Sequence, residues 1–181
     1  FNPMQMMQQQ QQMAMGMAMG MQQFNPLAMM QAQPMLTPDL QQRFMMIDQD
    51  RSGHITVDEI YKAYAQMKFP PRSAKMLLNA ISDKPYVDIQ VFPMFDHYVQ
   101  GFYQTFLMVG GQMGTIMPQQ ICQAAQMLGF QADQNALMRL IQKYDTDMNG
   151  TQFGEFMAIC SYLLICQKVI AKFDTAHRGT L

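Results

Sequence analysis

The sequence contains no tryptophan and is poor in charged residues, in cysteine and in long apolar runs. Charged side chains account for 14% of its 181 residues, against about 25% in a typical globular protein. The net charge of −1 gives no support to a basic surface of the kind that binds nucleic acid. Because the sequence has no uninterrupted run of about 18 apolar residues, we expect no transmembrane segment.

The three cysteines exclude a fold held together by disulfides. Cys122, Cys160 and Cys166 are odd in number, and their spacing matches no metal site. This pattern is typical of proteins from reducing compartments. We therefore expect a cytoplasmic location, with a cytoskeletal or cilium-type assembly as the more specific alternative. Because the sequence begins at Phe1 rather than at Met, we also expect a processed or partial chain.

The polar residues form no recognisable catalytic set. The three histidines, His54, His97 and His177, are scattered without metal-ligand spacing. No glycine-rich phosphate loop follows a predicted strand. Cys122 has no evident partner base in the sequence, so we expect it to be a buried structural thiol. The sequence thus predicts a protein that is not an enzyme.

The first 36 residues differ in composition from the rest of the chain. They hold 11 Met and 10 Gln, and the first charged residue of the protein is Asp39. Such low-complexity sequence cannot bury enough apolar surface alone to offset the entropy of ordering it. Two interpretations remain open: a flexible tail with a biased composition, or an arm that docks on another protein, because Met adapts to irregular apolar surfaces. We therefore divide the chain into an arm, 1–36, and a domain, 37–181.

From Thr37 onward the pattern predicts helices separated by short gaps, and hence an all-α fold. Thr37, Pro38 and Asp39 are typical of the cap and first turn of a helix. Thr56 and Glu59 match a capping box. We expect helices that begin near Thr37, Thr56, Ser73, Asp88, Pro118 and Asp133, and a long apolar helix from about 153 to 173.

The first gap, residues 48–59, matches the twelve-residue calcium loop of an EF-hand. Calcium prefers six to eight oxygen ligands. The predicted metal ligands are Asp48, Asp50 and Ser52 at positions 1, 3 and 5, the backbone carbonyl of His54 at position 7, and Glu59 at position 12. Gly53 at position 6 permits the sharp turn that this loop requires. Ile55 at position 8 is expected to pair with a second loop, and the alternative interpretation is a plain acidic turn between two helices.

Two later gaps, residues 80–91 and 109–120, keep an apolar residue at position 8 but have lost their ligands. Val87 and Ile116 occupy position 8. The second loop has Lys84 at position 5 and Val91 at position 12, and the third has Gln120 where a carboxylate is needed. We expect both loops to be metal-free.

The fourth and fifth gaps are incomplete. The fourth contains a possible weak calcium site formed by Asp145, Asp147, Asn149 and Glu155. It is one residue short after Gly150, which removes or misplaces the carbonyl of position 7. The fifth loop begins at Asp174, lacks its next ligands, and is cut off at the last residue of the chain.

Five hands with this spacing resemble the penta-EF-hand family, which includes sorcin, grancalcin, the calpain small subunit and the apoptosis-linked gene-2 product. The resemblance covers residues 37–181. It implies that the first hand pairs with the second and the third with the fourth, while the fifth forms a homodimer or heterodimer. It also implies calcium as the bound ion and a role as a calcium-responsive adaptor for partner proteins or membranes. In several relatives the third hand binds calcium, whereas Gln120 and the residues of the third loop here argue against it.

Two functions follow from these observations. The first is a calcium-binding adaptor or regulatory subunit that binds other proteins. The second is a structural scaffold component of a large assembly, in which most hands serve only for packing. In either case we expect protein partners to bind the arm, 1–36, and the last helix and loop, 156–181, with no role for nucleic acid.

Overall fold

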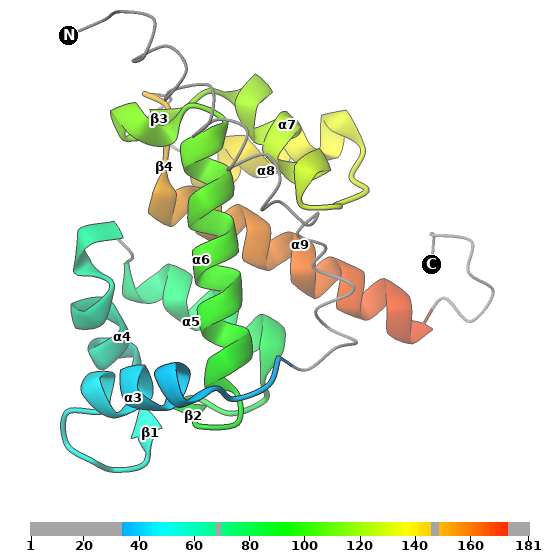
Figure 1. Ribbon diagram of the computed structural model, residues 1–181. Coiled ribbons are helices and arrows are strands. Elements are labelled where there is room, and N and C mark those ends of the chain that lie inside the picture. The colour runs from blue at the N-terminus through cyan, green and yellow to red at the C-terminus, as the bar shows by residue number, and fades with distance from the viewer. Residues whose placement is uncertain (1–33, 68–69, 146–148, 174–181) are drawn as a thin grey trace, which may run out of the picture.

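The computed structural model describes residues 34–67, 70–145 and 149–173. These residues form the expected all-α, EF-hand-type fold, in which helices are joined by loops that contain very short strands (Figure 1). Most of the predicted arm, and the fifth loop from Asp174 onward, lie outside the described residues. Asp147, one of the four possible ligands in the fourth loop, also lies outside them.

The N-terminal half of the domain contains the first two hands. Its elements are α3 (Pro38–Ile47), β1 (His54–Ile55), α4 (Val57–Ala63), the 3₁₀ helix η1 (Ala65–Met67), α5 (Pro71–Ile81), β2 (Val87–Asp88) and α6 (Phe92–Met108). The C-terminal half contains η2 (Gly111–Met113), β3 (Thr115–Ile116), α7 (Pro118–Met127), α8 (Gln134–Tyr144), β4 (Thr151–Gln152) and α9 (Phe153–Phe173).

Three helix starts are confirmed by their hydrogen bonds. The Thr37 hydroxyl accepts a hydrogen bond from the Leu40 amide at the start of α3. Thr56 and Glu59 form the predicted capping box at the start of α4. Asp133 accepts hydrogen bonds from two amides in the first turn of α8. Each cap satisfies backbone donors that would otherwise lack a partner inside the helix.

Two predicted caps are wrong. Helix α5 begins at Pro71, so Ser73 lies inside its first turn. The buried Ser73 hydroxyl instead donates a 2.6 Å hydrogen bond to the Gly154 carbonyl, a contact that sequence spacing does not indicate. Asp88 lies in β2, while α6 begins at Phe92. Asp88 still accepts hydrogen bonds from two amides of the turn between them.

The loops pair as predicted. Strands β1 and β2 are antiparallel, with Ile55 opposite Val87. Strands β3 and β4 are also antiparallel, with Ile116 opposite Thr151. Because Thr151 stands in the register of position 8, the one-residue deletion in the fourth loop falls at position 7. Each pair of loops thus forms one small sheet at the end of a two-hand unit.

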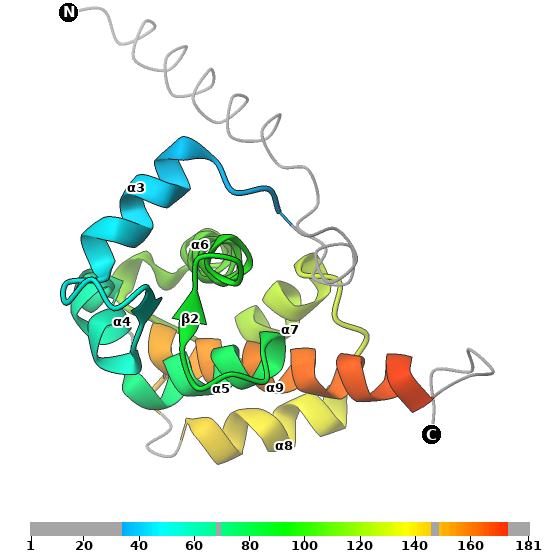
Figure 2. The ribbon, with the colours of Figure 1, turned by 90° about the horizontal axis from the view of Figure 1, so that it is seen from below.

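The core is built around α6 and rich in aromatic residues. Figure 2 shows α6 end-on, with α5 and α9 running side by side beneath it. Tyr98, Phe102 and Phe106 on α6 are buried. Phe106 contacts the rings of both Phe153 and Phe156 of α9, with ring centroids 5.5 and 5.7 Å apart. The two halves of the domain therefore share one continuous hydrophobic core.

Helix α9 is the one described helix that is long and apolar enough to cross a membrane, by length and composition alone. Its first half is buried in the core, including Phe156, Ile159 and Cys160. Its second half is more open, and Val169 and Phe173 are exposed. Packing of the first half against α5 and α6 accounts for the apolar sequence there.

Candidate calcium site

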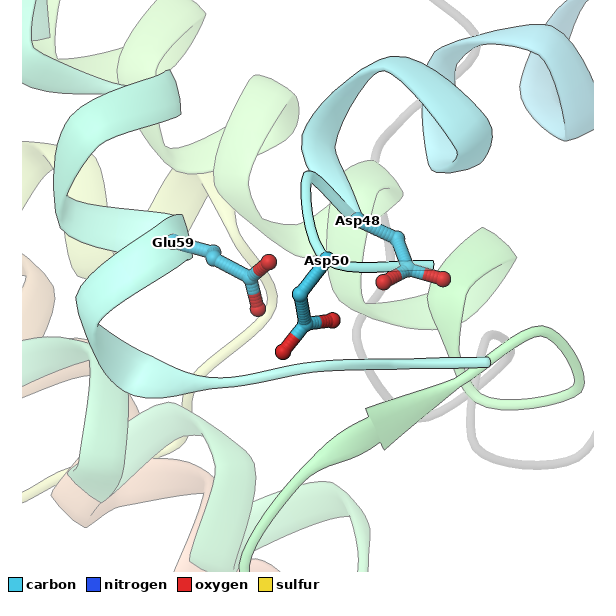
Figure 3. A group of neighbouring side chains, drawn as sticks. All are labelled: Asp48, Asp50 and Glu59. Carbon is cyan, nitrogen blue, oxygen red and sulfur yellow. The ribbon is translucent and has the colours of Figure 1, made fainter. Parts of the chain in front are cut away.

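Three carboxylates meet in the first loop. Asp48 directly follows α3, Asp50 lies within the loop, and Glu59 belongs to the first turn of α4. One carboxylate oxygen from each lies within 4.8 Å of the others. Figure 3 shows these side chains converging between the end of α3 and the start of α4. Within the described residues, no other group of three or more His, Cys, Asp or Glu side chains has its ligand atoms this close together.

Backbone amides hold the Asp48 carboxylate in place. Asp48 is buried. Its Oδ1 accepts a hydrogen bond from the Ser52 amide at 3.0 Å, and its Oδ2 accepts one from the Gly53 amide at 2.9 Å. Gly53 has φ of +82°, a conformation that residues other than glycine rarely adopt. The turn thus wraps the backbone around the first predicted ligand.

Glu59 is positioned by hydrogen bonds from both ends of the loop. Its Oε1 accepts from the Gln49 amide at 2.9 Å, and its Oε2 accepts from the Thr56 amide at 2.9 Å. Burial alone would raise the pKa of Glu59, but these hydrogen bonds outweigh burial, and the pKa lies below its ordinary value. The Ser52 hydrogen bonds likewise lower the pKa of Asp50. Both groups are therefore held in the charged form that a cation requires.

The two remaining predicted ligands lie next to each other. The Ser52 hydroxyl donates a 2.9 Å hydrogen bond to the His54 carbonyl. The His54 ring packs against Tyr86 of the second loop, with ring centroids 4.8 Å apart. The imidazole thus packs against the partner loop, while the His54 carbonyl lies beside the Ser52 hydroxyl. The role of this carbonyl as a ligand stays a prediction.

The donor set fits calcium. It consists of carboxylate, hydroxyl and carbonyl oxygens, the ligands that this hard cation prefers. Three carboxylates this close repel one another, and a divalent cation would relieve that repulsion. Asp48, Asp50 and Glu59 would hold the ion, with Ser52 and the His54 carbonyl completing the protein ligands.

The second loop carries its own positive charge. The Lys84 ammonium at position 5 lies 2.5 Å from the Asp88 carboxylate at position 9. Hydrogen bonding to Asp88, together with its charge, raises the pKa of Lys84, so the ammonium stays protonated. A fixed cation inside the loop opposes the entry of another, which supports the prediction of a metal-free loop.

The third loop is closed by an amide. Gln120 occupies position 12, where its Oε1 accepts from the Met117 amide at 2.7 Å. Its Nε2 donates to the Val109 carbonyl at 2.5 Å. This second bond joins the last and first positions of the loop without an ion. A carboxylate at this position could not donate the bond to Val109, which supports the prediction that the loop binds no metal.

The fourth loop has part of a site. The Oε2 of Glu155 accepts from the Gln152 amide at 2.9 Å, the same type of contact that Glu59 makes with Thr56. Asp145 is buried, and its Oδ2 accepts from the Thr151 hydroxyl at 3.0 Å. Its Oδ1 is buried and accepts no hydrogen bond from the described part of the chain. The weak calcium site of Asp145, Asp147, Asn149 and Glu155 therefore stays a prediction, with Asp147 outside the described residues.

Sequence reasoning missed one buried polar cluster beside the first hand. Asp96 of α6 is buried and contacts Arg43 of α3 and Tyr64 at the end of α4. The available signal was the one acidic residue within the mostly apolar segment 92–108, because a buried carboxylate requires partners. The prediction that Cys122 is a buried thiol is wrong, because Cys122 is half-buried, whereas Cys160 is buried.

Comparison with known proteins indicates the fold and no more. No model of a protein family matches the sequence, and no curated protein matches it. The chain is similar to the solved structure of a homolog of programmed cell death 6 protein from Leishmania major Friedlin. The TM-score is 0.60 at 20% sequence identity, and the match covers 78% of this chain and 85% of that chain.

Proposed function

We propose that this chain is a calcium-binding protein of the penta-EF-hand type that acts as an adaptor or regulatory subunit for other proteins. The observation that carries the proposal is the cluster of Asp48, Asp50 and Glu59, held between two helices by backbone hydrogen bonds. Three carboxylates at one calcium loop correspond to an affinity on the order of micromolar. The fold similarity to the homolog of programmed cell death 6 protein supports this type of protein.

The adaptor role rests on the surface that the domain leaves open. The exposed residues of the second half of α9 include Val169 and Phe173. Exposed apolar side chains gathered on one element are typical of protein interaction sites. The charge-free arm, 1–36, is the second proposed contact region. The proposal also takes the protein to be cytoplasmic and not an enzyme.

The test of calcium binding is titration calorimetry on the Glu59→Gln variant. Loss of the bidentate carboxylate should weaken binding at the first loop by at least about tenfold. The matched control is Asp58→Asn, which removes the same charge from the exposed neighbouring residue. Unchanged calcium binding in Glu59→Gln, or an equal loss in both variants, would show that the site is assigned wrongly.

A second candidate function is a scaffold component of a large, cytoskeletal or ciliary assembly. Two loops hold themselves closed without an ion, through Lys84 and Asp88 in one and through Gln120 and Val109 in the other. Hands of this kind serve packing rather than calcium sensing. The two functions differ in one property: calcium changes partner affinity for the adaptor and does not change it for the scaffold.

A further inference from the structure

The carboxylate of Asp96 joins three helices at one point. It receives a bidentate contact from Arg43 of α3, with N–O distances of 2.8 and 2.6 Å. The Tyr64 hydroxyl, at the end of α4, donates to the same carboxylate at 2.7 Å. Asp96 itself lies in α6 and is 4% exposed. Planar, charge-assisted pairs of this kind fix geometry as well as contributing energy.

Ring contacts of Phe92 and Phe95, in the turn of α6 before Asp96, hold the same three helices. Phe44, the one buried residue of α3, packs edge-on against Phe92 of α6 with centroids 5.5 Å apart. Tyr64 packs against Phe95 of α6 with centroids 6.3 Å apart. The hydrogen bonds of Asp96 with α3 and with Tyr64 are thus each accompanied by a ring contact with α6 from the same part of the chain.

The two tied helices carry the first and last predicted calcium ligands. Arg43 belongs to the same helix that delivers Asp48, and Tyr64 ends the helix that contains Glu59. The angle between α3 and α4 therefore determines the distance between these two ligands. Any motion that opens the first hand has to stretch the contacts of Asp96 with Arg43 or with Tyr64.

We propose that Asp96 is a positioning residue of the calcium site, which fixes α3 and α4 against α6 so that calcium enters a preformed loop and the first hand does not open. The proposal rests on calcium binding in the first loop and adds how that hand responds to the ion. A rigid hand of this type binds calcium without exposing a new apolar groove, in contrast to sensor hands, whose helices separate on binding.

The geometric part is tested by the distance between the two helices in the full chain. Spin labels are placed at Gln42→Cys and Lys62→Cys, which are exposed positions on α3 and α4, in a background with Cys122, Cys160 and Cys166 replaced by Ala. We expect one narrow distance distribution, the same with chelator and with calcium. Tyr64→Phe and Arg43→Gln should each broaden it with chelator. A calcium-dependent shift in the parent, or unbroadened variants, would overturn the proposal.

The binding part is tested by calorimetry on the same two substitutions in the native cysteine background. Each should weaken calcium binding by about threefold to tenfold, the range that corresponds to the net contribution of one ordinary hydrogen bond. The double variant should bind calcium with the same affinity as the single variant that binds it less tightly. Freeing either helix from Asp96 already allows the angle between α3 and α4 to change. Additive losses would indicate separate stabilising contacts and contradict a shared positioning role.

The control variant is Ser73→Ala, which removes a different buried hydrogen bond. The Ser73 hydroxyl donates to the Gly154 carbonyl, which does not belong to the first hand. The control variant should lower stability and leave calcium affinity unchanged. A parent that binds no calcium overturns the proposed function and this role together. A parent that binds calcium with the same affinity as Tyr64→Phe and Arg43→Gln overturns the positioning role alone.

Discussion

At position 12 of the first and third loops, Glu59 and Gln120 differ by one side-chain atom. Both accept a hydrogen bond from the amide three residues earlier. The second carboxylate oxygen of Glu59 accepts from the Gln49 amide, whereas the Gln120 amide donates to the Val109 carbonyl. One loop therefore leaves room for a cation among its carboxylates, and the other is closed by its own donor.

Replacing Gln120 by Glu should destabilise the domain. The new carboxylate oxygen would face the Val109 carbonyl, and losing this bond costs about 1–3 kcal/mol, toward the low end because Gln120 is half-buried. Urea unfolding measured with chelator checks this prediction. The control is Gln119→Glu at the exposed neighbouring position. Calcium stoichiometry should not rise, because the third loop lacks its other ligands; a new strong site in Gln120→Glu would contradict this account.

At the scale of the element, α9 has two different halves. The first is buried against α5 and α6, and Ile159 is completely inaccessible. In the second half, Phe173 is 62% exposed. The same apolar composition thus contributes to the core in one half and to the surface in the other.

Replacing Phe173 by Glu should change association and not folding. An exposed side chain contributes little to stability, so the change in unfolding free energy should stay within about 0.5 kcal/mol. If the second half of α9 is an interface, a new charge there should weaken self-association or partner binding by about tenfold or more. Sedimentation velocity measures the former, with Lys168→Glu, at an exposed position on the same helix, as control. Equal association in both variants would contradict an interface at Phe173.

At the scale of the whole molecule, the described residues hold one cluster of three carboxylates in a domain with two pairs of loops. In the first pair, the loop with three carboxylates packs against one that carries Lys84. In the second pair, the closed third loop packs against a fourth loop with part of a site. Calcium is therefore expected to act at one end of the molecule, while the rest keeps its shape without it.

Partner binding by the whole protein, measured with calcium and with chelator, distinguishes the two proposed functions. An adaptor should bind its partners at least about tenfold more tightly with calcium, and a scaffold should bind equally in both. Deleting residues 1–36 should remove partner binding and leave calcium affinity intact, since every predicted ligand lies after the arm. Loss of calcium binding on deletion would show that the arm belongs to the domain itself.

Local interactions made much of the fold predictable. The caps at Thr37, Thr56 and Asp133 depend on residues within the next turn, and all three are present in the structure. The loop of the first site depends on neighbours in the sequence in the same way. The predicted caps at Ser73 and Asp88 failed because each side chain has another role, in a long-range hydrogen bond and in a strand turn respectively.

The sequence by itself determined the helix-loop-helix pattern and the candidate ligand residues of the first loop, because each depends on residues close together along the chain. The register of the first pair of loops was predictable for another reason, because Ile55 and Val87 both occupy position 8 of their loops. The tertiary structure alone decided how the hands are held. Arg43 and Asp96 are 53 positions apart, and Ser73 and Gly154 are 81 positions apart. Such contacts arise only when packing of the aromatic core brings distant helices together, and no spacing rule encodes that.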